Sequence, residues 1–228
     1  MRALSMLLAT FLLIGNAAAQ TNSDTTLAAA LAFFQQANAS LLGSEQLSLK
    51  YEYASFHEAS TQPEEVLQGF LVRDKERYWQ EDLNRVVLLD KRYELYVDHA
   101  QQRMRLSPRK QKKLPLLTMS AEDLEAQVQS ATPLANGALT GYRYFFATGQ
   151  VRTLELWCDA NGQLHHSRLH YHTTDAFGNA QKTVLEVRYL EVAQKVTQPI
   201  QLETFLSVSR KAAQLAPQYA HYQLENLL

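Results

Sequence analysis

Short apolar runs, separated by charged and turn-compatible clusters, recur in the first half of the chain. Each run is about as long as one β-strand, and the connectors between runs are too short to hold a crossover helix. Neighbouring strands joined in this way pair antiparallel. The pattern therefore predicts a meander, a sheet laid down strand by strand. The runs are Leu67–Arg73, Arg77–Trp79, Val86–Leu89, Tyr93–Val97 and Arg103–Leu106.

The rest of the chain mixes helical and strand periodicity. Leu27, Leu31 and Phe34 recur at i, i+4 and i+7, which predicts a helix before the meander. Short helices are also predicted after a capping box at Ser120 and over residues 202–215, and a loop over residues 132–140. Further strands are predicted at residues 47–53, 141–147, 153–158, 164–172, 183–189 and 219–228.

This order of elements predicts a mainly β (α+β) fold with about nine to eleven strands. A large antiparallel sheet of this size curls toward a barrel. We therefore expect a curved antiparallel sheet, or incomplete β-barrel, closed by a few short helices. The helices need a place for their apolar faces, and the concave side of the sheet offers one.

The first 19 residues have the pattern of a secretory signal peptide. Arg2 gives a positive start, Leu4–Ile14 is mostly apolar, and Ala17–Ala19 is a small-residue cleavage site. We expect cleavage before Gln20, with residues 20–228 forming one domain. The residue directly after the cleavage site is not a cysteine, which a lipid anchor would need. No later apolar run is long enough to span a bilayer. The expected location is therefore periplasmic, without a lipid anchor.

Charge and cysteine content narrow the range of partners. The formal net charge of −1 argues against nucleic acid as a partner. Cys158 is the only cysteine, so an intrachain disulfide is not possible. Between Arg103 and Lys113 lie six positive charges and no negative one, which fits either a solvated loop or a docking surface. Such a surface would suit an acidic, membrane-associated protein partner or anionic headgroups. Its candidate residues are Arg105, Arg109, Lys110, Lys112 and Lys113.

Four histidines lie in one predicted strand. By strand alternation His166, His170 and His172 share a face, whereas His165 points to the other side. Only His170 and His172, about 7 Å apart, come near to chelating one ion. We therefore expect no metal site. The sequence also lacks a Gly-x-Ser-x-Gly elbow, a His-Glu-x-x-His motif and a phosphate-binding loop, so we expect no enzyme activity and no cofactor.

The strand positions carry more apolar and aromatic side chains than one sheet needs to contact three short helices. Two interpretations follow from this excess. The first is an ordinary filled core, and the second is an apolar cavity between sheet and helices that holds a lipid or an acylated protein. The candidate lining residues of such a cavity are Leu49, Tyr51, Val72, Val87, Leu95 and Met104.

Two segments of the meander resemble LolA-like outer-membrane lipoprotein carriers. Gly69–Arg73 followed by Arg77–Trp79 resembles the family's glycine-led strand, which runs through a basic residue to an aromatic pair. Leu88–Asp90 followed by Tyr93–Asp98 resembles its segment that ends in an aromatic residue and Asp. The order of elements agrees over most of residues 27–190.

The resemblance implies an incomplete antiparallel barrel whose apolar hollow shields lipid chains in the periplasm. We expect the protein to act as a monomer. The family's Arg-Pro pair is replaced here by Asp74-Lys75-Glu76, so Arg73 and Arg77 are the nearest candidates for its functional arginine. Two other function classes stay open. One is a non-catalytic interaction or sensor module with a filled core, and the other is an exported hydrolase.

Overall fold

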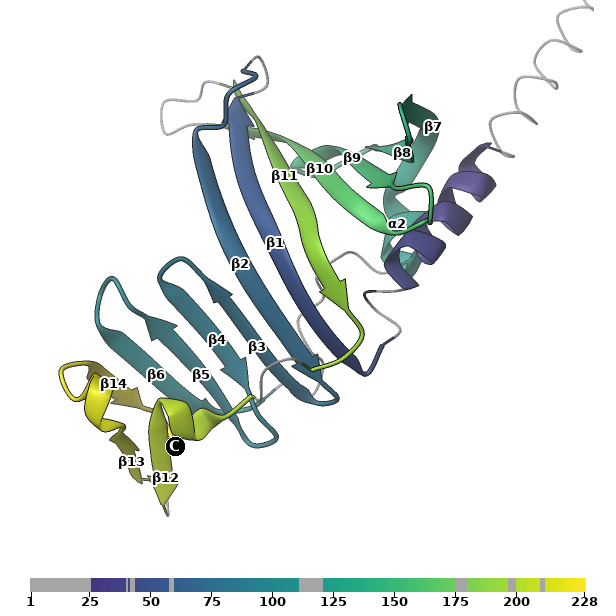
Figure 1. Ribbon diagram of the computed structural model, residues 1–228. Helices are drawn as coiled ribbons and strands as arrows, with labels where there is room; N and C mark the ends of the chain where they lie inside the picture. The colour runs from purple at the N-terminus through teal and green to yellow at the C-terminus, as the bar shows by residue number, and fades with distance from the viewer. Residues whose placement is uncertain are drawn as a thin grey trace, which may run out of the picture. The chain divides into compact units, whose positions relative to one another are not determined.

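The computed structural model divides into two compact units (Figure 1). The first combines Met1–Asn38 with Met119–Lys182, and the second combines Ala39–Thr118 with Thr183–Leu228. The expected signal peptide, residues 1–19, lies outside the described residues. In the part of the chain that is described, no helix is long and apolar enough to cross a membrane. The structure describes residues 26–39, 41, 44–57, 60–110, 121–174, 180–196, 200–209 and 212–228.

The predicted meander forms the centre of the second unit (Figure 1). Its strands are β1 (Gln46–His57), β2 (Glu65–Asp74), β3 (Arg77–Asp82), β4 (Arg85–Leu89), β5 (Tyr93–Asp98), β6 (Arg103–Pro108), β11 (Ala180–Ala193) and β14 (Gln223–Asn226). They lie in the order β14-β6-β5-β4-β3-β2-β1-β11. Each neighbouring pair is antiparallel except β14 and β6, which are parallel. The mainly β, antiparallel fold expected from the short connectors is confirmed.

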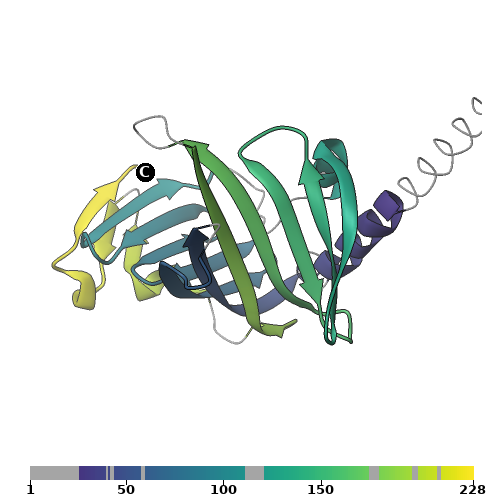
Figure 2. The same cartoon turned by 90° about the horizontal axis from the view of Figure 1, so that it is seen from above.

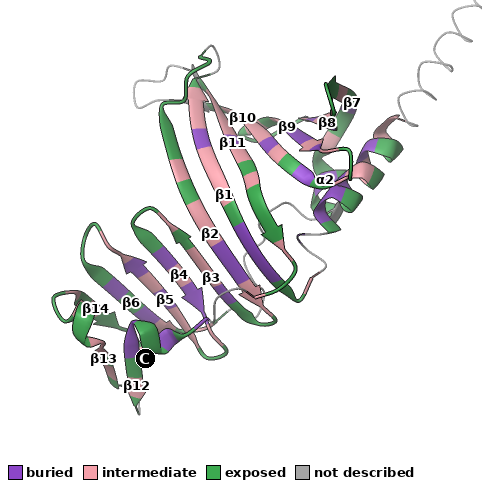
Figure 3. Ribbon diagram, viewed as in Figure 1, coloured by how far each residue is buried: buried purple, intermediate pink, exposed green. Residues whose placement is uncertain are grey.

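Alternation along these strands gives the sheet of the second unit two faces (Figure 3). The register pairs Val72 with Trp79, and Leu88 with Leu95, so their side chains share one face, which we call the covered face. The buried residues of this face form one cluster with the C-terminal segment. The residues of the covered face in that cluster are Val72, Val86, Leu88, Leu95, Val97, Met104 and Leu106.

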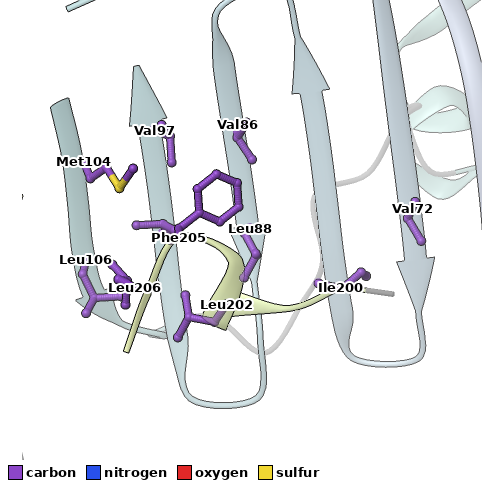
Figure 4. Packing of buried hydrophobic residues seen from close by; sticks show 11 residues of the cluster. Val72, Val86, Leu88, Val97, Met104, Leu106, Ile200, Leu202, Phe205 and Leu206 are labelled. Carbon is purple, nitrogen blue, oxygen red and sulfur yellow. The ribbon is translucent and has the colours of Figure 1, made fainter. Parts of the chain in front are cut away.

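Residues 200–209 and 212–222 pack against the covered face, and we call them the strap. Figure 4 shows the part of the strap around Ile200, Leu202, Phe205 and Leu206. Four large apolar side chains of the strap complete the cluster: Ile200, Leu202, Phe205 and Leu206, each no more than 6% exposed. Burying one such side chain contributes about 1.5 to 3 kcal/mol. The strap is therefore an integral part of this core.

The strap contains the largest departure from the predicted secondary structure. The helix predicted over residues 202–215 is wrong. The segment forms a 3₁₀ turn, η1 (Leu202–Thr204), and a hairpin of β12 (Leu206–Ser209) and β13 (Ala212–Leu215), followed by η2 (Pro217–Tyr219). Leu206 and Val208 alternate with two exposed serines, which is the period of a strand. The predicted terminal strand is present as β14.

Within the residues that the structure describes, the first unit holds four antiparallel strands and two helices (Figure 2). Its elements are a helix over residues 26–39, α2 (Ala121–Gln127), β7 (Val128–Asn136), β8 (Leu139–Phe146), β9 (Val151–Cys158) and β10 (Leu164–Thr174). Phe34 of the first helix packs edge-on against Tyr144, with ring centroids 5.9 Å apart. The Tyr144 hydroxyl donates a hydrogen bond to the carbonyl oxygen of Ala30, at 2.7 Å. Both helices predicted for this part of the chain are thus confirmed.

The loop predicted over residues 132–140 is wrong, because β7 and β8 form a hairpin there. Gly137, with φ of +59°, occupies the turn between them, a conformation that glycine adopts without steric cost. Pro133 lies inside β7, whose one partner in the sheet order is β8. Proline is tolerated on such an edge strand, since its missing N–H falls on the unpaired side.

Candidate functional site

The structure places the six predicted lining residues on both faces of the second unit's sheet. Three of them lie on the covered face, each at most 1% exposed and packed in the cluster beneath the strap: Val72, Leu95 and Met104. The other three lie on the opposite face. Leu49 pairs with Leu71, Leu71 with Gln80, and Gln80 with Val87, so these residues share one face. Leu71 is next to Val72 in β2, and this face is therefore opposite to the covered face. Tyr51, two residues from Leu49, shares that opposite face. The six residues therefore do not line one common space.

An open groove of about 470 Å³ adjoins the packed cluster. Ligand pockets in proteins usually measure about 300 to 1,000 Å³. Lys50 pairs with Phe70, and Phe70 pairs with Glu81, so the three side chains share one face. Phe70 is two residues before Val72 in β2, so this face is the covered face. Phe70 also packs against the buried cluster, so the groove and the core are continuous. The groove is lined by Lys50, Tyr51, Gln68, Gly69, Phe70, Glu81, Leu83 and Leu190.

Two backbone irregularities supply the exposed leucines of this groove. Leu190 is 52% exposed and occupies a bulge, because Lys50 pairs with Glu191 while Tyr51 pairs with Tyr189. A bulge inserts one extra residue and redirects its side chain. Leu83 is 65% exposed and lies in the β3–β4 turn with φ of +36°, a value uncommon for a residue with a side chain. Neither leucine was among the predicted site residues.

The Tyr51 side chain contacts Gly69, Gln80 and, through Gln80, Tyr78 on the opposite face of the sheet. Its ring lies across Gly69, where an added Cβ atom would be only 2.2 Å from the ring carbon Cζ. The Tyr51 hydroxyl accepts a hydrogen bond from Gln80 Nε2 at 2.9 Å, and the Tyr78 hydroxyl donates to Gln80 Oε1 at 2.6 Å. Burial raises the pKa of both tyrosines, so both hydroxyls remain protonated at neutral pH.

The two candidate arginines lie away from the groove. Arg73 donates hydrogen bonds to the carbonyl oxygens of Leu41 and Ser44, both at 2.5 Å, and burial lowers its pKa. It therefore ties the chain that enters β1 to strand β2. Arg77 is exposed and lines a separate pocket of about 370 Å³ together with Glu203 of the strap.

The positively charged segment between Arg103 and Lys113 has a structural part and an exposed part. Arg109 is half-buried and donates from Nη1 to the carbonyl oxygens of Glu76 and Asp90, at 2.5 and 2.8 Å. Arg105 is exposed and lies over the ring of Tyr96, 5.7 Å from its centroid. Lys110 is exposed as well. The remaining candidates, Lys112 and Lys113, lie outside the described residues.

The histidines of β10 do not follow the predicted alternation. The register of β10 shifts between Leu164 and His166, which makes a bulge at His165. As a result His165 and His166 lie side by side, with their Nδ1 atoms 2.8 Å apart, instead of on opposite faces. His166 stacks on the indole of Trp157, with ring centroids 5.6 Å apart. Among the described residues, no group of three or more His, Cys, Asp or Glu side chains could hold a metal ion.

Glu155 is the buried carboxylate among the described residues of the first unit and lies in a charged cluster. The residue is 3% exposed and accepts hydrogen bonds from Arg143 Nε at 2.8 Å and Trp157 Nε1 at 3.2 Å. Arg143 Nη2 lies 2.7 Å from the carboxylate and His170 Nε2 lies 3.5 Å from it. Burial alone would raise the pKa of Glu155, but the contacts with His170, Arg143 and Trp157 outweigh it and lower the pKa to about 2. The carboxylate is therefore ionised throughout the physiological range.

This depressed pKa predicts a loss of stability in acid. The unfolded chain binds a proton to Glu155 near pH 4.5, whereas the folded chain does so only near pH 2. The stabilisation is therefore complete above pH 4.5 and is lost as the pH falls toward 2. It amounts to about 3 kcal/mol. In a Trp79→Phe background, Glu155→Gln should flatten this slope in urea unfolding followed by Trp157 fluorescence. Equal slopes with and without Glu155→Gln would contradict the assignment.

No protein-family model matches the sequence, and no curated protein matches it. Among solved structures, the chain is similar to a conserved protein from Thermus thermophilus, with 10% identity and a TM-score of 0.45 over 86% of this chain and 98% of that one. It is similar to a LolA superfamily protein from Nitrosomonas europaea, with 8% identity and a TM-score of 0.34 over 77% and 99% of the two chains. It is also similar to a putative outer membrane lipoprotein-sorting protein domain from Vibrio parahaemolyticus, with 8% identity and a TM-score of 0.27 over 72% and 91%. The family that the glycine-led strand resembles is thus also found among the structural neighbours.

Proposed function

We propose that this protein is an exported, non-enzymatic binder of the acyl chains of lipids or acylated proteins. The acyl chain docks in the groove beside Phe70. The observation that carries this proposal is the continuity of apolar lining. It runs from the exposed leucines Leu83 and Leu190 through Phe70 to the core cluster. Two leucines more than half exposed at the mouth of one groove provide an apolar surface that a ligand can cover.

The physical gain from such binding is large. Each acyl methylene exposed to water costs about 0.8 kcal/mol, so a 16-carbon chain costs roughly 12 kcal/mol. A groove that covers part of the chain recovers part of that cost. Binding by apolar burial also needs few polar contacts, so a carrier of this kind can release its ligand again. The proposal places the protein in the periplasm as a monomer, after removal of residues 1–19.

The second candidate is a protein-interaction or sensor module without a lipid ligand. The observation in its favour is the strap, whose Ile200, Leu202 and Phe205 fill the apolar face that a larger cavity would need. On this view the leucines at the groove belong to a contact with another protein. Lipid binding by the purified chain separates the two candidates.

The test uses a fluorescent long-chain fatty acid and two matched variants. Leu190→Asp places a charge at the mouth of the groove, whereas Leu227→Asp places one at an equally exposed leucine of the C-terminus, at 52% and 51% exposure. We expect Leu190→Asp to weaken probe binding about tenfold, since burying one leucine contributes about 1.5 kcal/mol or more. Leu227→Asp should bind like the unchanged protein. If the unchanged protein binds no probe, the interaction module is the better account, and if both variants bind equally the ligand does not use the groove.

A further inference from the structure

Trp79 lies on the covered face between the groove and the strap. It pairs with Val72, while Phe70 of the groove pairs with Glu81, so Trp79 and Phe70 are diagonal neighbours on one face. On its other side the Trp79 indole meets Phe205 of the strap, with ring centroids 5.8 Å apart and planes at 63°. A ligand that extends inward from the groove past Phe70 therefore reaches Trp79 next.

The indole N–H of Trp79 has no hydrogen-bond partner among the described residues, although its nitrogen is buried. An unpaired buried donor is unfavourable, and buried indole N–H groups usually find an acceptor. The other tryptophan follows that rule, because Trp157 Nε1 donates to Glu155. The covered face thus carries a buried donor whose natural complement is an oxygen acceptor.

Phe205, whose ring packs against the Trp79 indole, is buried in the core cluster, and its backbone hydrogen bonds lie within the strap. Its backbone N–H donates to Leu202 and its carbonyl accepts from Ala216, both within the strap. Its ring stacks on Tyr219, also of the strap, at a centroid distance of 5.3 Å. Its packing on the sheet is a side-chain contact. The Phe205 side chain can therefore move off Trp79 without breaking its backbone hydrogen bonds, and the movement costs only part of its burial in the cluster.

We propose that Trp79 Nε1–H donates a hydrogen bond to the carbonyl oxygen of a bound acyl group, after Phe205 has moved aside. The site then takes fatty acyl groups with a carboxylate or ester oxygen at their head and discriminates against plain hydrocarbons. The inference rests on the proposed acyl-binding function. It adds the chemistry of the ligand's head group, the Trp79 N–H as the donor, and Phe205 as the gate, meaning the side chain that must move before the ligand reaches Trp79. It assigns the covered face beneath Phe205 as the inner end of the site.

The first test locates the ligand by fluorescence quenching. The chain has two tryptophans, so Trp157→Phe leaves Trp79 as the sole emitter and Trp79→Phe leaves Trp157. A fatty acid brominated near its carboxylate should quench the emission of the first variant at saturation and leave that of the second unchanged. Binding without quenching of Trp79 would overturn the inference while leaving the proposed function intact. Absence of binding in the unchanged protein would overturn both.

The second test measures selectivity with palmitate, methyl palmitate and hexadecane as competitors of a fluorescent fatty acid. Trp79→Phe keeps an aromatic ring against Phe205 but removes the N–H. We expect this variant to bind palmitate and the methyl ester about threefold to tenfold more weakly, which is the range for one hydrogen bond, and hexadecane within about twofold. A loss confined to palmitate identifies a free carboxylate as the ligand, and a loss for both oxygenated competitors identifies an acyl carbonyl in general. An equal loss for all three competitors would overturn the role of the N–H.

The gate is tested by the rate of association. Phe205→Leu keeps an apolar side chain in the strap but removes the aromatic contact with Trp79. We expect the fluorescent fatty acid to associate about threefold faster or more with this variant in stopped-flow measurements. An unchanged rate would show that the ligand does not need Phe205 to move, and would overturn this part of the inference.

Discussion

Leu95→Asp should unfold the second unit. Leu95 is fully buried on strand β5, in the cluster that the strap covers. The change removes a large apolar side chain and buries a carboxylate with no cationic partner in that cluster. We expect a loss of about 4 kcal/mol or more in the free energy of unfolding. A domain typically has about 5 to 15 kcal/mol in total, so the variant should be marginal or unfolded.

The measurement is urea unfolding followed by Trp79 fluorescence in a Trp157→Phe background. Leu227→Asp is the matched control, because the same change at an exposed leucine should shift stability by no more than about 0.5 kcal/mol. If Leu95→Asp is as stable as this control, water must reach Leu95 in the folded protein. The covered face would then be hollow instead of packed.

Gly141→Ala should be the most damaging small change in the first unit. A Cβ atom at Gly141 would lie 2.1 Å from the carbonyl oxygen of Leu156 and 3.3 Å from the Cα atom of Trp157. Both contacts are with the backbone of β9, which pairs with β8 at this point. Relief of the clash requires the two strands to separate. We expect a cost of about 3 kcal/mol or more, at the upper end of the range for overpacking.

Gly69→Ala is the informative comparison, since its new Cβ would also lie too close to a neighbour, at 2.2 Å from Tyr51 Cζ. Here the neighbour is the end of a side chain that can rotate away, at the expense of its hydrogen bond with Gln80. We expect a loss of about 1 to 2 kcal/mol for this variant. Thermal unfolding of both variants tests the difference, and a larger loss for Gly69→Ala would contradict it.

The fold could be predicted where its causes are local. Runs of apolar residues with short polar connectors determine antiparallel neighbours, and β2 to β6 follow that rule. Prediction failed where the apolar residues of one segment fitted both the helix period and the strand period. In residues 202–215, Phe205, Val208 and Ala212 fit a helix, but the strap has a sheet face to cover and forms a hairpin instead. Tertiary packing decides such cases, and the sequence does not display it.

The site was less predictable than the fold, because it depends on irregular backbone and on distant contacts. The burial of Val72 comes partly from a segment more than a hundred residues away, which no periodicity reveals. The bulge at Leu190 had one visible signal, since the apolar alternation through Val187 and Tyr189 is broken by an apolar residue directly after it. The turn at Leu83 had another, a leucine between Asp82 and Asn84.

The parallel pairing of β14 with β6 also protects the protein from self-association. A long antiparallel sheet ends in strands with unpaired N–H and C=O groups, which can add a strand from another molecule. Here the chain supplies that strand itself, since the N–H groups of Gln223 and Leu227 donate to the carbonyl oxygens of Gln102 and Leu106. The new edge is four residues long and includes a glutamate, both features that discourage further addition. The last residues of the chain thus act as a guard against aggregation, and a C-terminally clipped molecule would expose β6 as a template for polymerisation.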